Sequence, residues 1–308
     1  MQREKNKCSK MESLRCRHSS VSLRIFLASV VILLGAPRGL CACYKRIFSF
    51  GDSIIDSGNF GHMEHNGPCH DFPFGMTFFK HPTGRLCDGR VLIDFYDSKR
   101  QILGESLIVM GEIGGNDYNF WFNGLKPREE AAQFIPDIMA TIGSSIQELI
   151  GMGAKVILIP NNFPIGCVPS FLSFHRSGNP MDYDEYGCLR WFNDFSQRHN
   201  GALHGLVDQL GAQNPGVKLI YADYYGAAME FIRDPHMFGI GNPLTACCGG
   251  DNQPYHDGRL CNKMARIWGD PRGFASWDGM HMTEKAYEVI AHGVLEGPFA
   301  NPPLLRSC

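Results

Sequence analysis

A serine in a glycine-containing turn, Ser53, is a candidate catalytic nucleophile in this 308-residue chain. Ser53 follows the apolar run of residues 46–50, which is typical of a strand, and the run breaks at Gly51. A serine on a tight strand-to-helix turn projects its hydroxyl above the sheet edge and places its N–H at a helix N-terminus. This position suits a nucleophile whose transition state carries an oxyanion. Taken alone, however, the stretch favours an ordinary helix cap formed by Asp52 or Ser53.

A base for this serine is available near the other end of the chain. A serine hydroxyl is a poor nucleophile at neutral pH and needs a base beside it. Asp278 and His281 are three residues apart, so on one turn they can face the same way. The carboxylate can then hold one ring nitrogen while the other faces a hydroxyl. Either residue alone favours a structural interpretation, in which Asp278 caps the last helix and His281 lies at the surface.

Strands that alternate with helices must position these residues. A Gly-rich turn at 111–117 directly follows the second predicted strand, and such turns bind ligands in α/β proteins. The alternation implies a mostly parallel sheet with helices on both faces, and we see no linker that would divide it into two domains. The predicted strands are 46–50, 107–110, 155–160 and 217–221, and the predicted helices are 126–149, 183–210, 222–232 and 283–295.

Local signals add detail to this scheme. Asp88 is expected to cap a short helical pattern that follows it, and Pro136 is expected to kink the helix at 126–149. Residues 61–83 and 234–276 are rich in turn-forming residues and are predicted to be loops, the second tied by disulfides.

The composition argues against a nucleic-acid partner. Hydrophobic residues make up 44% and charged residues 19%, as in ordinary globular proteins. The net charge of -2 gives no electrostatic reason to propose binding to DNA or RNA. Residues 62–65 contain two histidines and a glutamate, but without the spacing of a zinc-binding helix. We therefore expect no metal and no other cofactor.

The first 43 residues are predicted to be a secretory signal peptide. Basic residues precede an apolar run at 25–34, and small residues follow it. A membrane span needs about 20 apolar residues, so this run is too short, and no other segment is apolar enough to be an anchor. We expect residues 44–308 to form a single secreted, extracellular domain. The sequence leaves open whether Met1 or Met11 is the start, and it does not indicate an oligomeric state.

Cysteine usage is consistent with an oxidising compartment. The chain has 12 cysteines, and their spacings lack the paired C-x-x-C of a structural zinc site. Connectivity is open, but proximity suggests three pairs: Cys69 with Cys87, Cys167 with Cys188, and Cys247 or Cys248 with Cys261.

Five ordered motifs carry a family resemblance, at residues 50–59, 114–118, 162–167, 246–250 and 277–284. Together they resemble the plant GDSL esterase/lipase family of the SGNH hydrolase superfamily. The resemblance extends over residues 44–298 and implies a flavodoxin-like α/β fold with ester hydrolysis that needs no metal. Ile54 follows the serine where the family name implies leucine, an apolar exchange that should be harmless.

The resemblance implies a role for each matching residue. Ser53 would attack the ester carbonyl, His281 would take its proton and later pass it to the leaving alcohol, and Asp278 would orient His281. The Ser53 backbone N–H and the Asn116 side chain would hold the oxyanion. The substrate would be a small-molecule or lipid ester, and the resemblance does not choose among such esters.

One family block is missing from this sequence. Members of the family carry, between the first two motifs, an edge strand followed by a glycine whose N–H is a third oxyanion donor. Here residues 93–96 run almost directly into 103–107, whereas a strand with its crossover helix needs about 30 residues. We therefore expect the strand at 46–50 to be an exposed edge and turnover to be reduced. The alternative is a catalytically inactive or unstable truncated isoform that acts, if at all, as a binding protein.

Overall fold

The computed structural model describes residues 42–64, 67–97, 102–124, 126–251, 254–256, 261–301 and 304. Residues Ala42–Cys308 belong to one compact unit. The predicted signal peptide, residues 1–43, lies outside the described residues except for its last two positions. Within the described part, no helix is both long and apolar enough to cross a bilayer.

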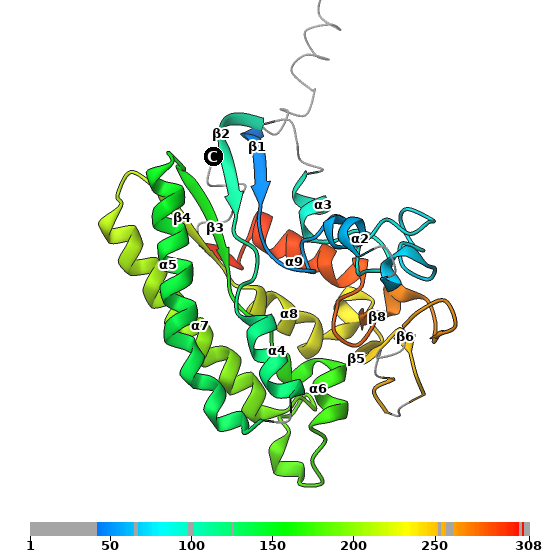
Figure 1. The fold of residues 1–308 in the computed structure, drawn as a ribbon. Coiled ribbons are helices and arrows are strands. Elements are labelled where there is room, and N and C mark those ends of the chain that lie inside the picture. Colours follow the sequence, from blue (N-terminus) through cyan, green and yellow to red (C-terminus); the bar gives the residue numbers. More distant parts are fainter. Residues whose placement is uncertain are drawn as a thin grey trace, which may run out of the picture. The chain divides into compact units, whose positions relative to one another are not determined.

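A five-stranded sheet forms the centre of this unit, in the order β1-β2-β3-β4-β9 (Figure 1). Its first four strands are parallel, and β9 pairs antiparallel with β4. The four predicted strands are confirmed, whereas β9 has only two residues and offers no pattern to recognise. The strands are β1 (Ala42–Ser49), β2 (Ile102–Val109), β3 (Val156–Pro160), β4 (Lys218–Ala222) and β9 (Ala300–Asn301).

Helices cover both faces of the sheet, which confirms the predicted α/β class (Figure 1). All five residues of strand β3 are buried, and the first four alternate between two cores, as expected for a strand that is covered on both faces. Ile157 and Ile159 join one core, and Val156 and Leu158 join the other. The first core is covered by α4 (Gly115–Asn123), α5 (Ile135–Gly151) and α7 (Arg190–Gln213), and the second by α3 (Leu92–Asp97), α8 (Tyr224–Arg233) and α9 (Glu284–Glu296).

Short elements complete the fold. Two small sheets pair β5 (Asn242–Ala246) with β8 (Phe274–Ser276) and β6 (Cys248–Gly249) with β7 (Arg266–Ile267). The short helices are α2 (Asn59–Met63), α6 (Pro169–Phe174), and the 3-10 turns η1 (Pro68–His70), η2 (Arg128–Phe134), η3 (Ile165–Cys167), η4 (Pro180–Asp182), η5 (Pro235–Phe238) and η6 (Pro271–Gly273).

Two predicted helices begin later than expected. The segment 126–149 starts as the 3-10 turn η2, and Pro136 then lies in the first turn of α5 rather than kinking a longer helix. Proline is tolerated there because the first N–H groups of a helix have no intrahelical acceptor. The segment 183–210 becomes helical only at Arg190, because Tyr183 and Leu189 form a β-bridge that closes a loop.

Strand β1 lies at the end of the sheet. It pairs with β2 on one side, and no other described strand pairs with it. The side chains of Phe48 and Phe50 are 47% and 55% exposed beside this edge. The edge therefore has both open backbone groups and apolar surface.

Two of the three suggested disulfides are present, Cys167–Cys188 and Cys248–Cys261. The pairing of Cys69 with Cys87 was wrong, because both are free and buried, as is Cys247. The Cys87 thiol instead hydrogen-bonds to the backbone oxygens of Arg90 and Met282.

Candidate active site

Ser53 lies in the turn that follows β1, at the carboxyl end of the parallel strands. The turn is closed by Asp52, whose side chain accepts a hydrogen bond from the Ile54 N–H at 3.1 Å. Gly111, after the neighbouring strand β2, packs so closely that a Cβ there would lie 2.3 Å from the Phe50 carbonyl oxygen. The two turns after β1 and β2 are thereby brought together.

The helix expected directly after Ser53 is absent. The first helix, α2, begins only at Asn59, and Asp56 accepts the N–H groups of its first turn. The prediction was wrong because an Asx turn at Asp52 and a bend intervene. The Ser53 N–H therefore belongs to a turn rather than to a helix N-terminus.

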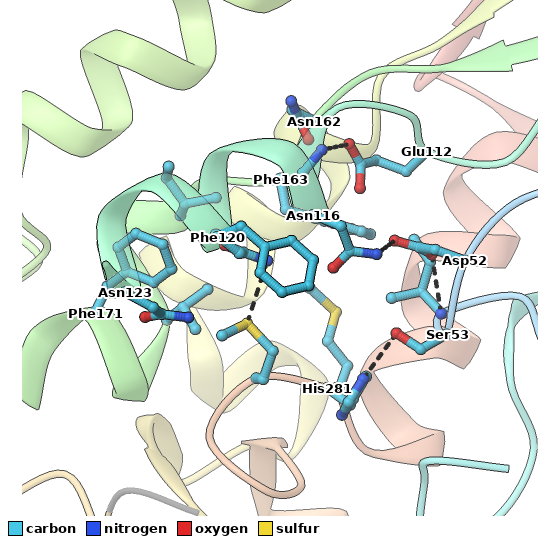
Figure 2. A pocket seen from close by; sticks show the side chains of 17 residues that line it. Asp52, Ser53, Glu112, Asn116, Phe120, Asn123, Asn162, Phe163, Phe171 and His281 are labelled. Atoms are coloured by element: carbon cyan, nitrogen blue, oxygen red, sulfur yellow. Dashed lines mark hydrogen bonds between the residues drawn. The ribbon is translucent and has the colours of Figure 1, made fainter. Parts of the chain in front are cut away.

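Asp278 and His281 occupy the turn between β8 and α9. One oxygen of Asp278 accepts the backbone N–H groups of Met280 at 3.0 Å and His281 at 2.8 Å, which fixes the carboxylate in the turn. Its other oxygen lies 2.7 Å from Nδ1 of His281. On the far side of the ring, Nε2 lies 2.8 Å from Oγ of Ser53 (Figure 2). Three residues from opposite ends of the chain thus form one continuous hydrogen-bonded relay.

Electrostatics favour a proton on His281. Burial alone would lower the pKa of this ring, but the charge and hydrogen bond of Asp278, together with the charge of Asp52, outweigh it. The pKa of His281 is therefore raised above its ordinary value of 6.5. Such a ring can accept a proton from Ser53 and hold it beside the carboxylate.

Asn116 comes to the same place from the first turn of α4. Its side-chain Nδ2 donates a hydrogen bond to Oδ2 of Asp52 at 3.2 Å (Figure 2). Glu112, in the turn before the helix, accepts the Gly115 N–H at 3.0 Å. Sequence reasoning considered Asp52 only as a cap and overlooked Glu112. The one available signal was an acidic residue inside a Gly-rich turn after a strand.

A pocket of about 270 Å³ opens beside Ser53, His281 and Asn116. Its wall is formed largely by apolar side chains, with asparagine amides along α4. Three aromatic residues of α4 lie near this pocket: Phe120 lines it, whereas Tyr118 and Phe122 are buried in the core. Within the described ranges, no group of three or more His, Cys, Asp or Glu side chains could hold a metal ion.

Residues 104–294 match the model of the GDSL-like lipase/acylhydrolase family. A GDSL esterase/lipase of Arabidopsis thaliana is 37% identical, with 93% of each chain covered. A second from the same plant is 35% identical with 92% of each chain covered, and the sinapine esterase of Brassica napus is 32% identical with 90% of this chain and 92% of the relative covered. This chain belongs to the GDSL family. It is therefore a serine carboxylic-ester hydrolase, and it resembles plant members throughout most of its length.

The alignments to these GDSL relatives are longer than the chain itself. They extend over 356 to 365 positions, whereas the chain has 308 residues. The relatives therefore have residues for which this chain has no counterpart. The family-model match contains Asn116, Asp278 and His281 but begins after Ser53.

Proposed function

We propose that this GDSL-family protein is a secreted serine esterase or lipase that uses Ser53, His281 and Asp278 as a catalytic triad. The observation that carries the proposal is the relay from Ser53 Oγ to His281 Nε2 at 2.8 Å and from His281 Nδ1 to Asp278 at 2.7 Å. No group beyond these side chains and a water molecule is needed for ester hydrolysis.

The reaction would proceed in two halves. Ser53 Oγ attacks the ester carbonyl while His281 Nε2 takes its proton, and His281 then passes that proton to the leaving alcohol. Water, activated by His281, hydrolyses the acyl-enzyme and restores Ser53. Asp278 holds the ring in the tautomer with the proton on Nδ1 and stabilises the imidazolium that forms.

The oxyanion would be held by the Asn116 side chain and the Ser53 backbone N–H. One such donor contributes about 3 kcal/mol to transition-state stabilisation. The third donor of the family is expected to be missing with the block between residues 96 and 103, so turnover should be lower than in full-length relatives. The length of the alignments supports this expectation.

The substrate class is a small-molecule or lipid ester. The apolar wall of the pocket favours an apolar or aromatic group next to the reacting carbonyl, and Phe120 and Phe163 are available to contact it. Because one relative is named sinapine esterase, sinapine should be tested together with p-nitrophenyl esters of graded chain length.

Secretion to the extracellular space is part of the same proposal. It is supported by the signal-peptide pattern of residues 1–43 and by the disulfides Cys167–Cys188 and Cys248–Cys261. Expression of a tagged full-length chain in plant cells, followed by N-terminal sequencing of protein from the medium, tests this. Recovery of the unprocessed chain in the cytosol alone would contradict it.

An active-site-directed phosphonate tests the triad. We expect the reagent to label Ser53 in the wild type and to label neither Ser53→Ala nor His281→Ala. Ser57→Ala is the matched control, because Ser57 is an exposed serine in the same loop. Labelling that persists in Ser53→Ala would overturn the proposal.

The second candidate is a shortened isoform that is inactive or unstable and acts, if at all, as a binding protein. The open edge of β1 favours it, since an unprotected edge strand promotes aggregation. A cooperative thermal melt without phosphonate labelling would support an inactive binding protein. The absence of a cooperative melt would support an unstable chain.

A further inference from the structure

Two carboxyl groups, a half-buried one on Asp52 and a buried one on Glu112, lie at the start of α4 although neither belongs to the Ser-His-Asp relay. Asp52 reaches the side chain of Asn116 through the Nδ2–Oδ2 hydrogen bond of 3.2 Å. Glu112, which is 6% exposed, reaches the residue before it through the Gly115 N–H at 3.0 Å. Both carboxyl groups line the same pocket as Asn116 (Figure 2).

We propose that Asp52 and Glu112 are positioning residues for the oxyanion hole, Asp52 by orienting the Asn116 amide and Glu112 by fixing the backbone that carries it. The inference rests on the proposed function, in which Asn116 is an oxyanion donor. It explains why the nitrogen of the Asn116 amide, and not its oxygen, faces Asp52.

The chemistry of a carboxylate makes this orientation specific. An ionised carboxylate only accepts hydrogen bonds, so the Asn116 group that faces Asp52 must be its nitrogen and not its oxygen. The amide nitrogen has two hydrogens. Asp52 takes one of them, and the second remains available to an oxyanion in the pocket. A flipped amide would instead present oxygen to Asp52, which is repulsive.

Glu112 holds the backbone at the start of α4. Helix α4 begins after Gly114, which has φ of 108° and no side chain to cap the helix. The Glu112 carboxyl supplies the missing acceptor for the Gly115 N–H. A Cβ on Gly115 would lie 2.5 Å from Oε2 of Glu112, so a larger residue there would displace the carboxyl group from its present position. Asn116 therefore enters the pocket from a fixed first turn.

The pKa values of the two carboxyl groups are raised to different extents. Burial, followed by the charge of Asp52, raises the pKa of Glu112 well above its ordinary value. Burial also raises the pKa of Asp52, but the N–H of Ile54 and the charge of His281 oppose this rise. Of the two groups, Glu112 therefore takes up a proton more readily, and Asp52 is the better acceptor for Asn116.

Substitution of Asp52 by asparagine gives the sharpest test. Asp52 uses separate oxygens for Ile54 and Asn116, but asparagine has only one oxygen. Its NH₂ group would face the Asn116 nitrogen and favour the flipped amide. We expect Asp52→Asn to lower kcat about 10²-fold, close to the loss for Asn116→Ala, with little change in KM. Asp52→Ala should lower kcat less than Asp52→Asn does. A milder loss in Asp52→Asn than in Asp52→Ala would overturn the orienting role.

A double-mutant cycle shows whether Asp52 acts through Asn116. In the Asn116→Ala background, Asp52→Asn should cost little further activity, because the amide that it misorients is gone. Fully additive losses would overturn the proposal. The acid limb of kcat/KM gives a second readout, since Asp52 and Asp278 are the two charges that raise the pKa of His281. Removing the Asp52 charge should move this limb to lower pH, which a merely structural role would not do.

Glu112 is tested by a conservative pair of variants. Glu112→Gln keeps an oxygen for the Gly115 N–H and should retain activity, whereas Glu112→Ala should lower kcat about as far as Asn116→Ala. Equal activity of the two variants would contradict the backbone role. Asp56→Asn is the matched control, because Asp56 accepts N–H groups of the α2 turn in the same loop without contacting Asn116.

A measurement without turnover separates this inference from the proposed function. In Ser53→Ala, the side-chain amide proton of Asn116 that faces Asp52 should show a downfield NMR shift, and Asp52→Asn should abolish that shift. Its absence in Ser53→Ala would overturn the orienting role. If the shift is present but the wild type shows no Ser53-dependent turnover, the proposed function fails and the geometry of Asn116 stands.

Discussion

Asp88 accepts a hydrogen bond from the backbone N–H of Glu284 at 2.8 Å, across 196 positions of sequence. The Glu284 carboxylate in turn binds the side chain of Arg90 at 2.8 Å. Asp88 was expected to cap the helix that follows it, but it caps the start of α9 instead. Because α9 begins three residues after His281, the segment around Asp88 holds the histidine turn in place.

Substitution of Asp88 tests the strength of this link. Asp88→Ala leaves the Glu284 N–H without its acceptor in a buried site, so the free energy of unfolding should fall by about 1–3 kcal/mol. Asp88→Asn retains an acceptor, so its free energy of unfolding should fall less. Urea unfolding measures both. Asp208→Ala is the control, because its side chain is 70% exposed on α7. A loss for Asp88→Ala no larger than this control would show that the cap contributes nothing.

Alkylation distinguishes the free thiols from the disulfides. Cys69, Cys87 and Cys247 are buried, and burial raises the pKa of each thiol, to about 12 for Cys247. We expect iodoacetamide to leave all three unmodified in the folded protein and to modify all three after unfolding without reductant. Peptide mass spectrometry identifies the modified sites. Protection of Cys69 and Cys87 after unfolding would restore the pairing that the structure contradicts.

Features set by neighbouring residues were predictable from the sequence. The four parallel strands follow from short apolar runs, and the α/β class follows from their alternation with helices. The Asp278–His281 contact is also local, since one turn brings the two side chains together. The contact of His281 with Ser53 was inferred from the motifs jointly, because neither residue indicates the other alone.

Features set by distant parts of the chain were missed. The partner of Asp88 lies in α9, and nothing near Asp88 in sequence indicates it. Cys69 and Cys87 are near in sequence, but the fold directs the Cys87 thiol toward Met282 instead. Glu112 was overlooked because a buried acid can be recognised only from the groups packed around it. Tertiary packing decided each of these outcomes.

The raised pKa of His281 affects the pH dependence of the esterase activity. The ring must be neutral to act as a base, so kcat/KM should rise with pH through a value above 6.5. Asp278→Asn removes the charge and the acceptor that raise this pKa. We expect its acid limb to move to lower pH and kcat to fall about 10⁴-fold. Pre-steady-state rates with p-nitrophenyl acetate between about pH 5 and 9 measure both effects. An unshifted limb would exclude His281 as the titrating base.

The same pKa links stability to pH. A histidine whose pKa is raised on folding contributes stability that is fully present below its unfolded value of 6.5. This stability is lost as the pH rises through the folded value. The free energy of unfolding should therefore be higher for the wild type than for Asp278→Asn. This difference should be largest below pH 6.5 and should shrink at higher pH. Urea unfolding of both proteins across this range provides the test, and a difference that grows with pH would have the wrong sign.

The open edge of β1 should govern self-association. Among the described strands only β2 pairs with β1, so the outer side of β1, beside the exposed Phe48 and Phe50, offers a template for another strand. A charge on such an edge opposes pairing. We expect the wild type to form larger species as its concentration rises and Phe48→Lys to suppress them, as measured by light scattering. Met152→Lys is the control, because Met152 is 71% exposed but lies at the end of α5. Equal suppression by both lysines would assign the effect to net charge, whereas suppression by Phe48→Lys alone assigns it to the edge.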